Sequence, residues 1–491
     1  MSAIMNFVYR VLVFFLAAAF LSSYSLAKAK PEMIEERDWI KLSLAGMDLI
    51  TDANKECALK LFGDFESFKR VAQMVTGVNL SQTVRPFKVF ALKKNRHFKS
   101  LTKGMISSSN VIGLHFENVE GNFSIVDIDS CRGSVSAREV LSFENKGLAI
   151  NLGKLKNGHV LSFTHYGLRF MPSEELLKIR RRPKTKKDAW RLYAQGWLIT
   201  HYMLSNESTR VGLIKYLGYI NSGLNEDASF SKSFDFTYKE LDNELRSYVN
   251  RKSYKYKKIV INRNDLLRDI LVTKISHSDV LTEVGNMLAA KGFGFDRVSP
   301  YFKHSLVLNS DNLKSKAALA LLVSRERPKR AMELIDEVFD SNIDDPWIYT
   351  AKGKIYSEMS RLVGVGDIDS QASVDFANES LRAFKVGLQQ SANISAMIGV
   401  GDIYFRQGYV EKAVIVFEAA ESYAPANDAV CKNLILAYYA SGDVDGAKRV
   451  VDRYRNKHHR SEKSIEEFNE WVKRVSSKFE VKVNRKVELN L

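Results

Sequence analysis

The chain has 491 residues, of which 45% are hydrophobic and 26% charged, and a formal net charge of +16. This composition excludes a largely disordered chain, and the length predicts two or more domains. Only eight residues are proline, which argues against long disordered linkers.

The N-terminal segment, residues 1–27, has the features of a cleaved secretory signal. Arg10 precedes an apolar run, Val11–Leu21, and the small residues Ser25 and Ala27 follow it. That run is too short to cross a bilayer as a helix, which takes about 20 residues, so we expect cleavage rather than a permanent anchor. We therefore predict a periplasmic or secreted protein with no transmembrane anchor after signal cleavage. Nucleic acid is a poor partner for a protein in that compartment.

Three cysteines, Cys57, Cys131 and Cys431, bear on the compartment. An oxidising compartment permits disulfide bonds, and Cys57 and Cys131 are the only pair within one predicted domain. The alternative is that all three are buried small hydrophobic residues. Because the sequence contains no C-x-x-C spacing, we predict neither a redox motif nor a cysteine zinc site.

Residues 38–262 are predicted to form an α+β domain. A helix is expected over 53–75, where apolar residues from Cys57 to Val75 recur at helical spacing. Ser173 is expected to be the N-cap of a helix over 174–179, and further helices are expected at 187–204, 210–221 and 238–249. Strands are expected within 39–51 and at 87–93, 110–116, 123–128, 148–152 and 160–164, with a short strand or linker at 257–261.

The C-terminal half repeats at an interval of 34 residues, which predicts an all-α tetratricopeptide-type solenoid. Small residues at two consensus positions let the helices of one pair approach closely, and neighbouring pairs must stack to bury their remaining apolar surface. We predict four to five helix pairs over 279–460, with an insertion near 361–373, and then a capping helix and tail over 461–491. Within 394–427, the consensus positions hold Gly401, Tyr404, Ala413, Phe417, Ala420 and Pro425.

Such an array is a scaffold for binding and carries no chemistry of its own. One helix of each pair lines its concave surface, and we expect a protein or peptide partner in this groove. The alternative for each residue is that it faces solvent or a neighbouring helix. The predicted groove residues are Lys354, Glu358, Asp402, Phe405, Arg406, Lys432, Leu436 and Tyr439.

One segment concentrates positive charge and is a second candidate site. It reads KIRRRPKTKK over residues 178–187. Runs of this kind bind lipid headgroups, acidic polymers or acidic partners, and the alternative is a solvated loop between two helices. The predicted basic patch consists of Lys178, Arg180, Arg181, Arg182, Lys184, Lys186 and Lys187.

Four stretches before residue 250 carry a family resemblance. They are Trp39 with the helix through Leu61 and FESF at 65–68, the strand at Val89, YAQGWLITHYML at 193–204, and residues 216–248, which begin YLGYINSG. The third is similar to a Y-A-Q-S-W-x-L-x-H-Y-L-L helix found in exported bacterial proteins. In those proteins a peptidase-MA-like, gluzincin-type zinc domain precedes tetratricopeptide repeats. The resemblance covers most of residues 38–250, and it implies an α+β fold of that type.

The motif that makes that family an enzyme is absent from this sequence. The resemblance implies an H-E-x-x-H helix, whose two histidines bind zinc and whose glutamate activates a metal-bound water. The interval where the family carries this motif, 130–147, contains no histidine, and only Glu139 stands where the family has a ligand-bearing glutamate. His159 and His165 are six residues apart, about 20 Å along a strand, and His201 is expected to pack in a core.

We therefore expect a non-catalytic binding scaffold without cofactor or metal, in which a degenerate peptidase-like domain accompanies a repeat groove. A residual zinc-dependent hydrolase using Glu139 and scattered histidines is one alternative. An envelope-surface or polymer-binding protein using the basic patch is another. The sequence contains no G-x-S-x-G, Walker or G-x-G-x-x-G motif, so neither acyl hydrolysis nor nucleotide binding is predicted.

Overall fold

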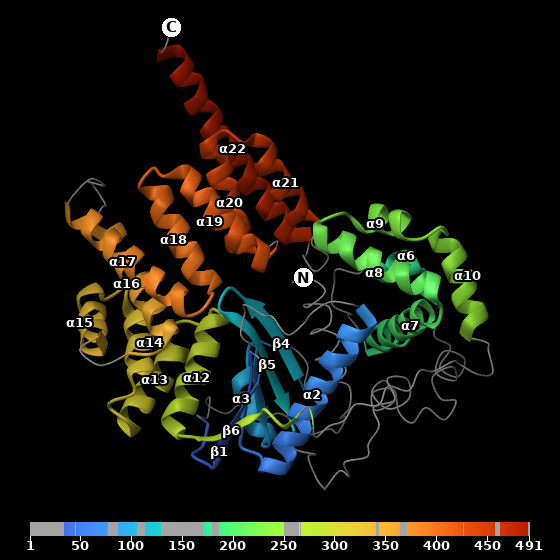
Figure 1. Ribbon diagram of the computed structural model, residues 1–491, viewed down its shortest axis with the longest axis horizontal. Coiled ribbons are helices and arrows are strands. Elements are labelled where there is room, and N and C mark those ends of the chain that lie inside the picture. The colour runs from blue at the N-terminus through green and yellow to red at the C-terminus, as the bar shows by residue number, and fades with distance from the viewer. Residues whose placement is uncertain are drawn as a thin grey trace.

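An N-terminal part built on a mixed β-sheet precedes a helix-rich C-terminal part (Figure 1). The expected strands at 148–152 and 160–164, and the segment 257–261, lie outside the residues that the structure describes. The structure, a computed structural model, describes residues 34–44, 46–76, 87–105, 113–128, 170–178, 186–249, 265, 267–339, 343–363, 371–425, 427–456 and 462–489.

Six strands form one sheet in the order β4-β5-β3-β2-β1-β6. The neighbours β2–β3 and β3–β5 are parallel, and the other pairs are antiparallel. The strands expected near 39–51, 87–93, 110–116 and 123–128 are confirmed. β6 is not expected from the sequence, and it lies beyond residue 262, the predicted end of the α+β domain. The strands are β1 Trp39–Leu44, β2 Met47–Thr51, β3 Phe87–Leu92, β4 Gly113–Asn118, β5 Gly121–Asp127 and β6 Leu271–Ile275.

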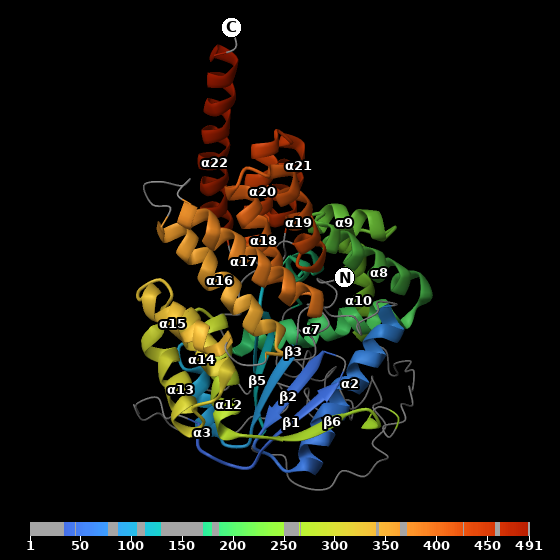
Figure 2. The same ribbon diagram turned by 60° about the vertical axis from the view of Figure 1, so that its left-hand side comes forward.

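Helices cover both faces of this sheet. Successive residues of a strand point to opposite faces, so each strand contributes side chains to both cores. Leu49 and Val89 pack against α2 (Lys55–Thr76) on one face. Ile50 and Phe90 belong to the core of the other face. That core includes buried residues of α14 (Leu313–Val323) and of three helices that Figure 2 shows side by side: α3 (Asn95–Thr102), α12 (His277–Ala290) and α13 (Phe295–Leu308). The first helices of the C-terminal part therefore share a hydrophobic core with the N-terminal sheet.

A separate small core lies among five helices of the described residues between β5 and β6. The expected helices in this region are confirmed, but Ser173 is not an N-cap. It is the first helical residue, after Pro172, and its hydroxyl and backbone N–H both donate to Asp242. The sequence also missed α9, whose residues EDASFSKS include few apolar side chains. The helices are α6 Ser173–Leu177, α7 Lys186–Ser205, α8 Glu207–Ser222, α9 Glu226–Ser233 and α10 Tyr238–Val249.

The C-terminal helices pack in consecutive pairs, from α12 with α13 to α20 with α21. The first helices of successive pairs also contact one another. The last helix, α22, takes up most of the predicted capping helix and tail, and it projects from the body (Figure 1). No helix in the described residues is long and apolar enough to span a bilayer. The helices after α13 are α14 Leu313–Val323, α15 Pro328–Phe339, α16 Pro346–Val363, α17 Gln371–Gln390, α18 Ile394–Arg406, α19 Val410–Tyr423, α20 Asp428–Ser441, α21 Val444–Arg455 and α22 Glu462–Leu489.

A glycine lets the two helices of a pair approach closely. A Cβ atom on Gly353 of α16 would lie 2.5 Å from the ring of Phe384 on α17, closer than real Cβ contacts allow. A Cβ atom on Gly401 of α18 would likewise lie too close to the ring of Phe417 on α19. Both phenylalanine rings are 1% exposed, so the space that each glycine leaves is filled by an aromatic side chain of the core.

The cysteines differ in state. Cys57 on α2 is disulfide-bonded, and Cys431 on α20 is a buried thiol. Cys131 lies outside the described residues. The interpretation of all three cysteines as buried small hydrophobic residues is therefore wrong for Cys57, which is disulfide-bonded.

Candidate functional site

The predicted groove residues lie on α16, α18 and α20, the first helices of three successive pairs. The β4–β5 turn covers one end of this surface. There Glu120 forms an ion pair with Lys354 of α16, and Asn118 donates to the carbonyl of Ala290 on α12. Burial alone would raise the pKa of Glu120, but the Lys354 ammonium lowers it below its usual value. Lys354 is thus engaged within the molecule.

Helix α22 covers the other end. The Nζ atom of Lys432 lies 5.7 Å from the ring centroid of Trp471. The ring of Tyr439 stacks on Phe479, with 6.0 Å between centroids. Because Trp471 and Phe479 both belong to α22, Lys432 and Tyr439 of α20 contact the last helix. Phe405 and Leu436 are half-buried, and Phe405 packs against the core shared by α19, α20 and α21.

The middle of the surface holds a network of ion pairs, here named the central charge cluster: Arg325, Glu358, Arg361, Asp402 and Arg406. Arg361 contacts Asp402 at 2.7 Å and Glu358 at 3.6 Å. Arg406 contacts Asp402 at 3.1 Å, and Arg325, in the turn after α14, contacts Glu358 at 3.4 Å. The cluster joins two first helices, α16 and α18, and the turn that follows a third, α14.

Exposure divides this cluster into an inner and an outer set. The side chains of Glu358 and Asp402 are 19% and 21% exposed, whereas those of Arg361 and Arg325 are 45% and 79% exposed. Arg406, at 26%, also donates to the hydroxyls of Ser357 and Ser360. The groups that a partner meets first are therefore guanidinium groups, which bind carboxylates well.

Sequence reasoning found Glu358, Asp402 and Arg406 but missed Arg325 and Arg361. A signal existed for Arg361, because it follows Glu358 by three residues on one helix, a spacing that places the two side chains together. Arg325 has no such signal, since its contact with Glu358 depends on how α14 packs against α16.

The basic patch is described only in part. Lys178 forms ion pairs with Glu174 at 2.7 Å and Asp227 at 2.6 Å. Although burial lowers the pKa of Lys178, its bonds to these two carboxylates raise it overall. Residues 180, 181, 182 and 184 lie outside the described residues, as do the side chains of Lys186 and Lys187. The described cation of this patch is thus paired within the molecule.

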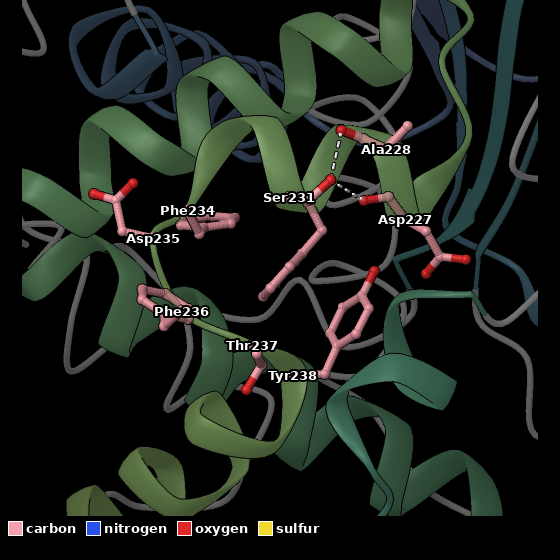
Figure 3. A pocket seen from close by; sticks show the side chains of 9 residues that line it. Asp227, Ala228, Ser231, Phe234, Asp235, Phe236, Thr237 and Tyr238 are labelled. Carbon is pink, nitrogen blue, oxygen red and sulfur yellow. Dashed lines mark hydrogen bonds between the residues drawn. The ribbon is translucent and has the colours of Figure 1, made fainter.

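A shallow hollow of about 710 Å³ lies beside Lys178, between α9 and the start of α10 (Figure 3). Phe230 and Tyr238 stack with 4.0 Å between their centroids, and the Lys178 ammonium lies 5.7 Å from the Tyr238 ring centroid. Phe230 is 3% exposed. The hollow is therefore largely the outer surface of a packed aromatic cluster. Its lining residues are Asp227, Ala228, Phe230, Ser231, Phe234, Asp235, Phe236, Thr237 and Tyr238.

Of the four residues considered above for zinc, the structure describes only His201. His201 is half-buried, its Nδ1 lies 2.7 Å from the hydroxyl of Tyr248, and burial lowers the pKa of its imidazole. Glu139, His159 and His165 lie outside the described residues. Among the residues that are described, no group of three or more His, Cys, Asp and Glu side chains is placed to hold a metal ion.

The chain matches no known protein-family model and no curated protein. Its similarity to peptidase-MA-like proteins therefore stays a prediction from the residues that carry it. An N-terminal part with a mixed sheet and a helix-rich C-terminal part are shown.

Proposed function

We propose that this protein is an exported, non-catalytic scaffold that binds an acidic segment of a partner protein. In this proposal the helices from α12 to α21 form a tetratricopeptide-type repeat array. The interval of 34 residues in the sequence supports it, as do the packing of consecutive helices in pairs and the contacts between successive first helices. The close approach of Gly353 to Phe384 and of Gly401 to Phe417 is what such an array requires of its small consensus positions.

One observation carries the choice of an acidic partner: the arginines of the central charge cluster are more exposed than its carboxylates. Arg325 and Arg361 are 79% and 45% exposed, so they can exchange their internal partners for external ones at little desolvation cost. Glu358 and Asp402 stay behind them and fix their positions. A carboxylate of a partner can then accept two parallel hydrogen bonds from one guanidinium group.

The N-terminal part is proposed to be a degenerate peptidase-MA-like domain that supports the array. The absence of H-E-x-x-H and the core that the sheet shares with α12 and α13 favour a structural role over a catalytic one. The disulfide-bonded Cys57 fits an oxidising compartment. This agrees with export through the N-terminal segment and with a periplasmic or secreted location.

The proposal is tested with a fluorescein-labelled peptide rich in glutamate and with glutamine and lysine peptides of equal length. We expect the mature protein to bind the glutamate peptide selectively, with an affinity that falls as salt is added. Exchange of Arg325 and Arg361 for glutamate should weaken that binding at least about tenfold, because both cations then repel the peptide. Fluorescence anisotropy measures the affinity, and circular dichroism checks the fold.

A double variant with the same change in charge serves as the control. Arg330 on α15 and Arg382 on α17 are 54% and 71% exposed, and each pairs with a glutamate of its own helix. Their exchange for glutamate should leave the affinity within about twofold of the wild type, because both lie outside the cluster. Equal losses in the two double variants would show a general charge effect and would refute the cluster as the binding site. So would tighter binding of the glutamine or lysine peptide.

A further inference from the structure

The parallel strands β2, β3 and β5 end at the same edge of the sheet. Asp52 follows β2, and Lys93 and Lys94 follow β3. The helix α3 begins there at Asn95, and its N-cap residue, Lys94, makes no side-chain capping bond. In open sheets of this kind, ligands bind beyond the carboxyl ends of the parallel strands, and helix N-termini favour anions.

Three cationic side chains converge on one carboxylate at this edge. Glu35, in the segment before β1, lies 2.9 Å from the Nζ atom of Lys94 and 3.5 Å from a terminal nitrogen of Arg37. Arg96 also donates to it. The Glu35 carboxylate is therefore the shared partner of three cations, and its side chain is still 43% exposed.

A buried histidine with unmet hydrogen bonds faces the same carboxylate. His97 is 1% exposed, and within the described residues neither of its ring nitrogens has a hydrogen-bond partner. Its Nε2 atom lies 3.8 Å from the Glu35 carboxylate, which is too long for a hydrogen bond. Buried polar groups normally have a hydrogen-bond partner. Because Glu35 lies too far away to accept a hydrogen bond from this imidazole, the imidazole is placed to bond another group at this edge.

Two other carboxylates of the described residues lie at this edge, and both are already used. Asp127, at the end of β5, accepts from the side chain of Asn95, and the other is Asp52. Its side chain is fully buried, it accepts from the backbone N–H of Lys93 at 2.7 Å, and it lies 3.5 Å from Arg37. Without Glu35, the edge would present the cations of Arg37, Lys94 and Arg96 and the His97 imidazole against these two carboxylates, which already have partners. The balance of charge would favour an anion from outside the chain.

We propose that this edge is a binding site for a carboxylate or phosphate group, and that Glu35 occupies it in this structure as an internal ligand. The cations are on α3, just before it, and in the segment leading to β1. An external anion would replace the Glu35 carboxylate between them. The site is separate from the central charge cluster, and it does not depend on the function proposed for that cluster.

The test removes the internal ligand by the substitution Glu35→Gln in the full mature chain. Calorimetric titrations with inorganic phosphate and with succinate, at constant ionic strength, compare the variant with the wild type. We expect the variant to bind at least one of these anions at least about tenfold more tightly, because an internal competitor lowers the apparent affinity of the wild type. Binding of phosphate alone would assign the site to phosphoryl ligands, and binding of succinate alone to carboxylate ligands.

Glu36→Gln is the matched control, since Glu36 is the adjacent exposed carboxylate. This control should bind both anions as weakly as the wild type. Adding Arg96→Gln to the Glu35 variant should abolish the gain in affinity. If neither anion binds the Glu35 variant more tightly than the control, the proposal is wrong.

A second measurement needs no substitution and covers the case in which the Glu35 variant does not fold. Phosphate or succinate that displaces Glu35 from the wild type should increase hydrogen exchange in residues 34–39, compared with chloride at equal ionic strength. No increase with either anion would contradict the proposal.

Discussion

Glu283 on α12 links the N-terminal sheet to the C-terminal helices, and its removal should lower stability strongly. Its carboxylate forms ion pairs with Lys88 of β3 and, at 3.0 Å, with Lys314 of α14. The three side chains are 11%, 17% and 28% exposed. Substitution with glutamine keeps the shape but leaves two ammonium groups around a neutral amide.

Breaking a buried ion pair from one side costs about 3–5 kcal/mol of folding free energy. Lys88 and Lys314 retain some contact with water, and Lys314 also lies 3.5 Å from Asp345. We therefore expect Glu283→Gln to lower the free energy of unfolding by about 3 kcal/mol, the lower end of that range. Urea unfolding followed by circular dichroism measures this difference.

The control is Glu337→Gln on α15. Glu337 also contacts two cations, Lys316 at 3.5 Å and Arg330 at 3.9 Å, but its side chain is 47% exposed. Exposed ion pairs contribute about 0–1 kcal/mol, so this variant should unfold nearly as the wild type does. If the two variants lost equal stability, the argument from burial would be refuted.

Glu283 should also make the free energy of unfolding depend on pH. Burial alone would raise the pKa of Glu283, but Lys88 and Lys314 lower it far below its usual value. A carboxyl with a depressed pKa stabilises the fold above its unfolded pKa of about 4.3, and this stabilisation is lost as the pH falls toward the folded value. The difference in stability between wild type and Glu283→Gln should be largest near pH 7 and should shrink below about pH 4. A constant difference would show that Glu283 acts by packing and not by charge.

Two further predictions concern packing and covalent structure. Gly353→Ala places a Cβ 2.5 Å from the buried ring of Phe384 and should cost about 1–3 kcal/mol by overpacking. Gly218→Ala, with no atom within 4 Å of the new Cβ, should stabilise its helix by up to about 1 kcal/mol; equal thermal shifts in the two variants would contradict this. Reduction of the disulfide of Cys57 should lower stability by about 2–5 kcal/mol, while the buried thiol of Cys431 stays unreactive toward Ellman's reagent until the chain unfolds. An unchanged melting temperature after reduction would rule out a stabilising role for the bond.

Local patterns in the sequence determined most of the helices and strands. The apolar spacing over 53–75 predicted α2, which runs over Lys55–Thr76, because burial of one helical face requires that spacing. The apolar run at 87–93 predicted β3, which is buried on both faces of the sheet. The interval of 34 residues predicted the order of helices after residue 281. Each of these predictions uses a spacing of residues that can be read along one continuous stretch of the chain.

Only the tertiary structure decided which residues meet across the chain. β6 reads LVTKI, and it pairs with β1 through Trp39 and Ile275, far apart in sequence. Lys354 and Tyr439 stand at predicted groove positions, yet Glu120 and Phe479 contact them. Helical periodicity places a side chain on a face, but it carries no information about which distant element covers that face.

The two proposed sites show the same division. The pairing of Glu358 with Arg361 follows from a spacing of three residues on one helix, and sequence alone can suggest it. The meeting of Glu35 with Lys94, Arg96 and His97 cannot be read from the sequence, because it requires the segment before β1 to reach the end of β3. Parallel strands bring their carboxyl ends to one edge only after the intervening helices have packed on the sheet. Long-range packing, and not local pattern, therefore decides where these charges converge.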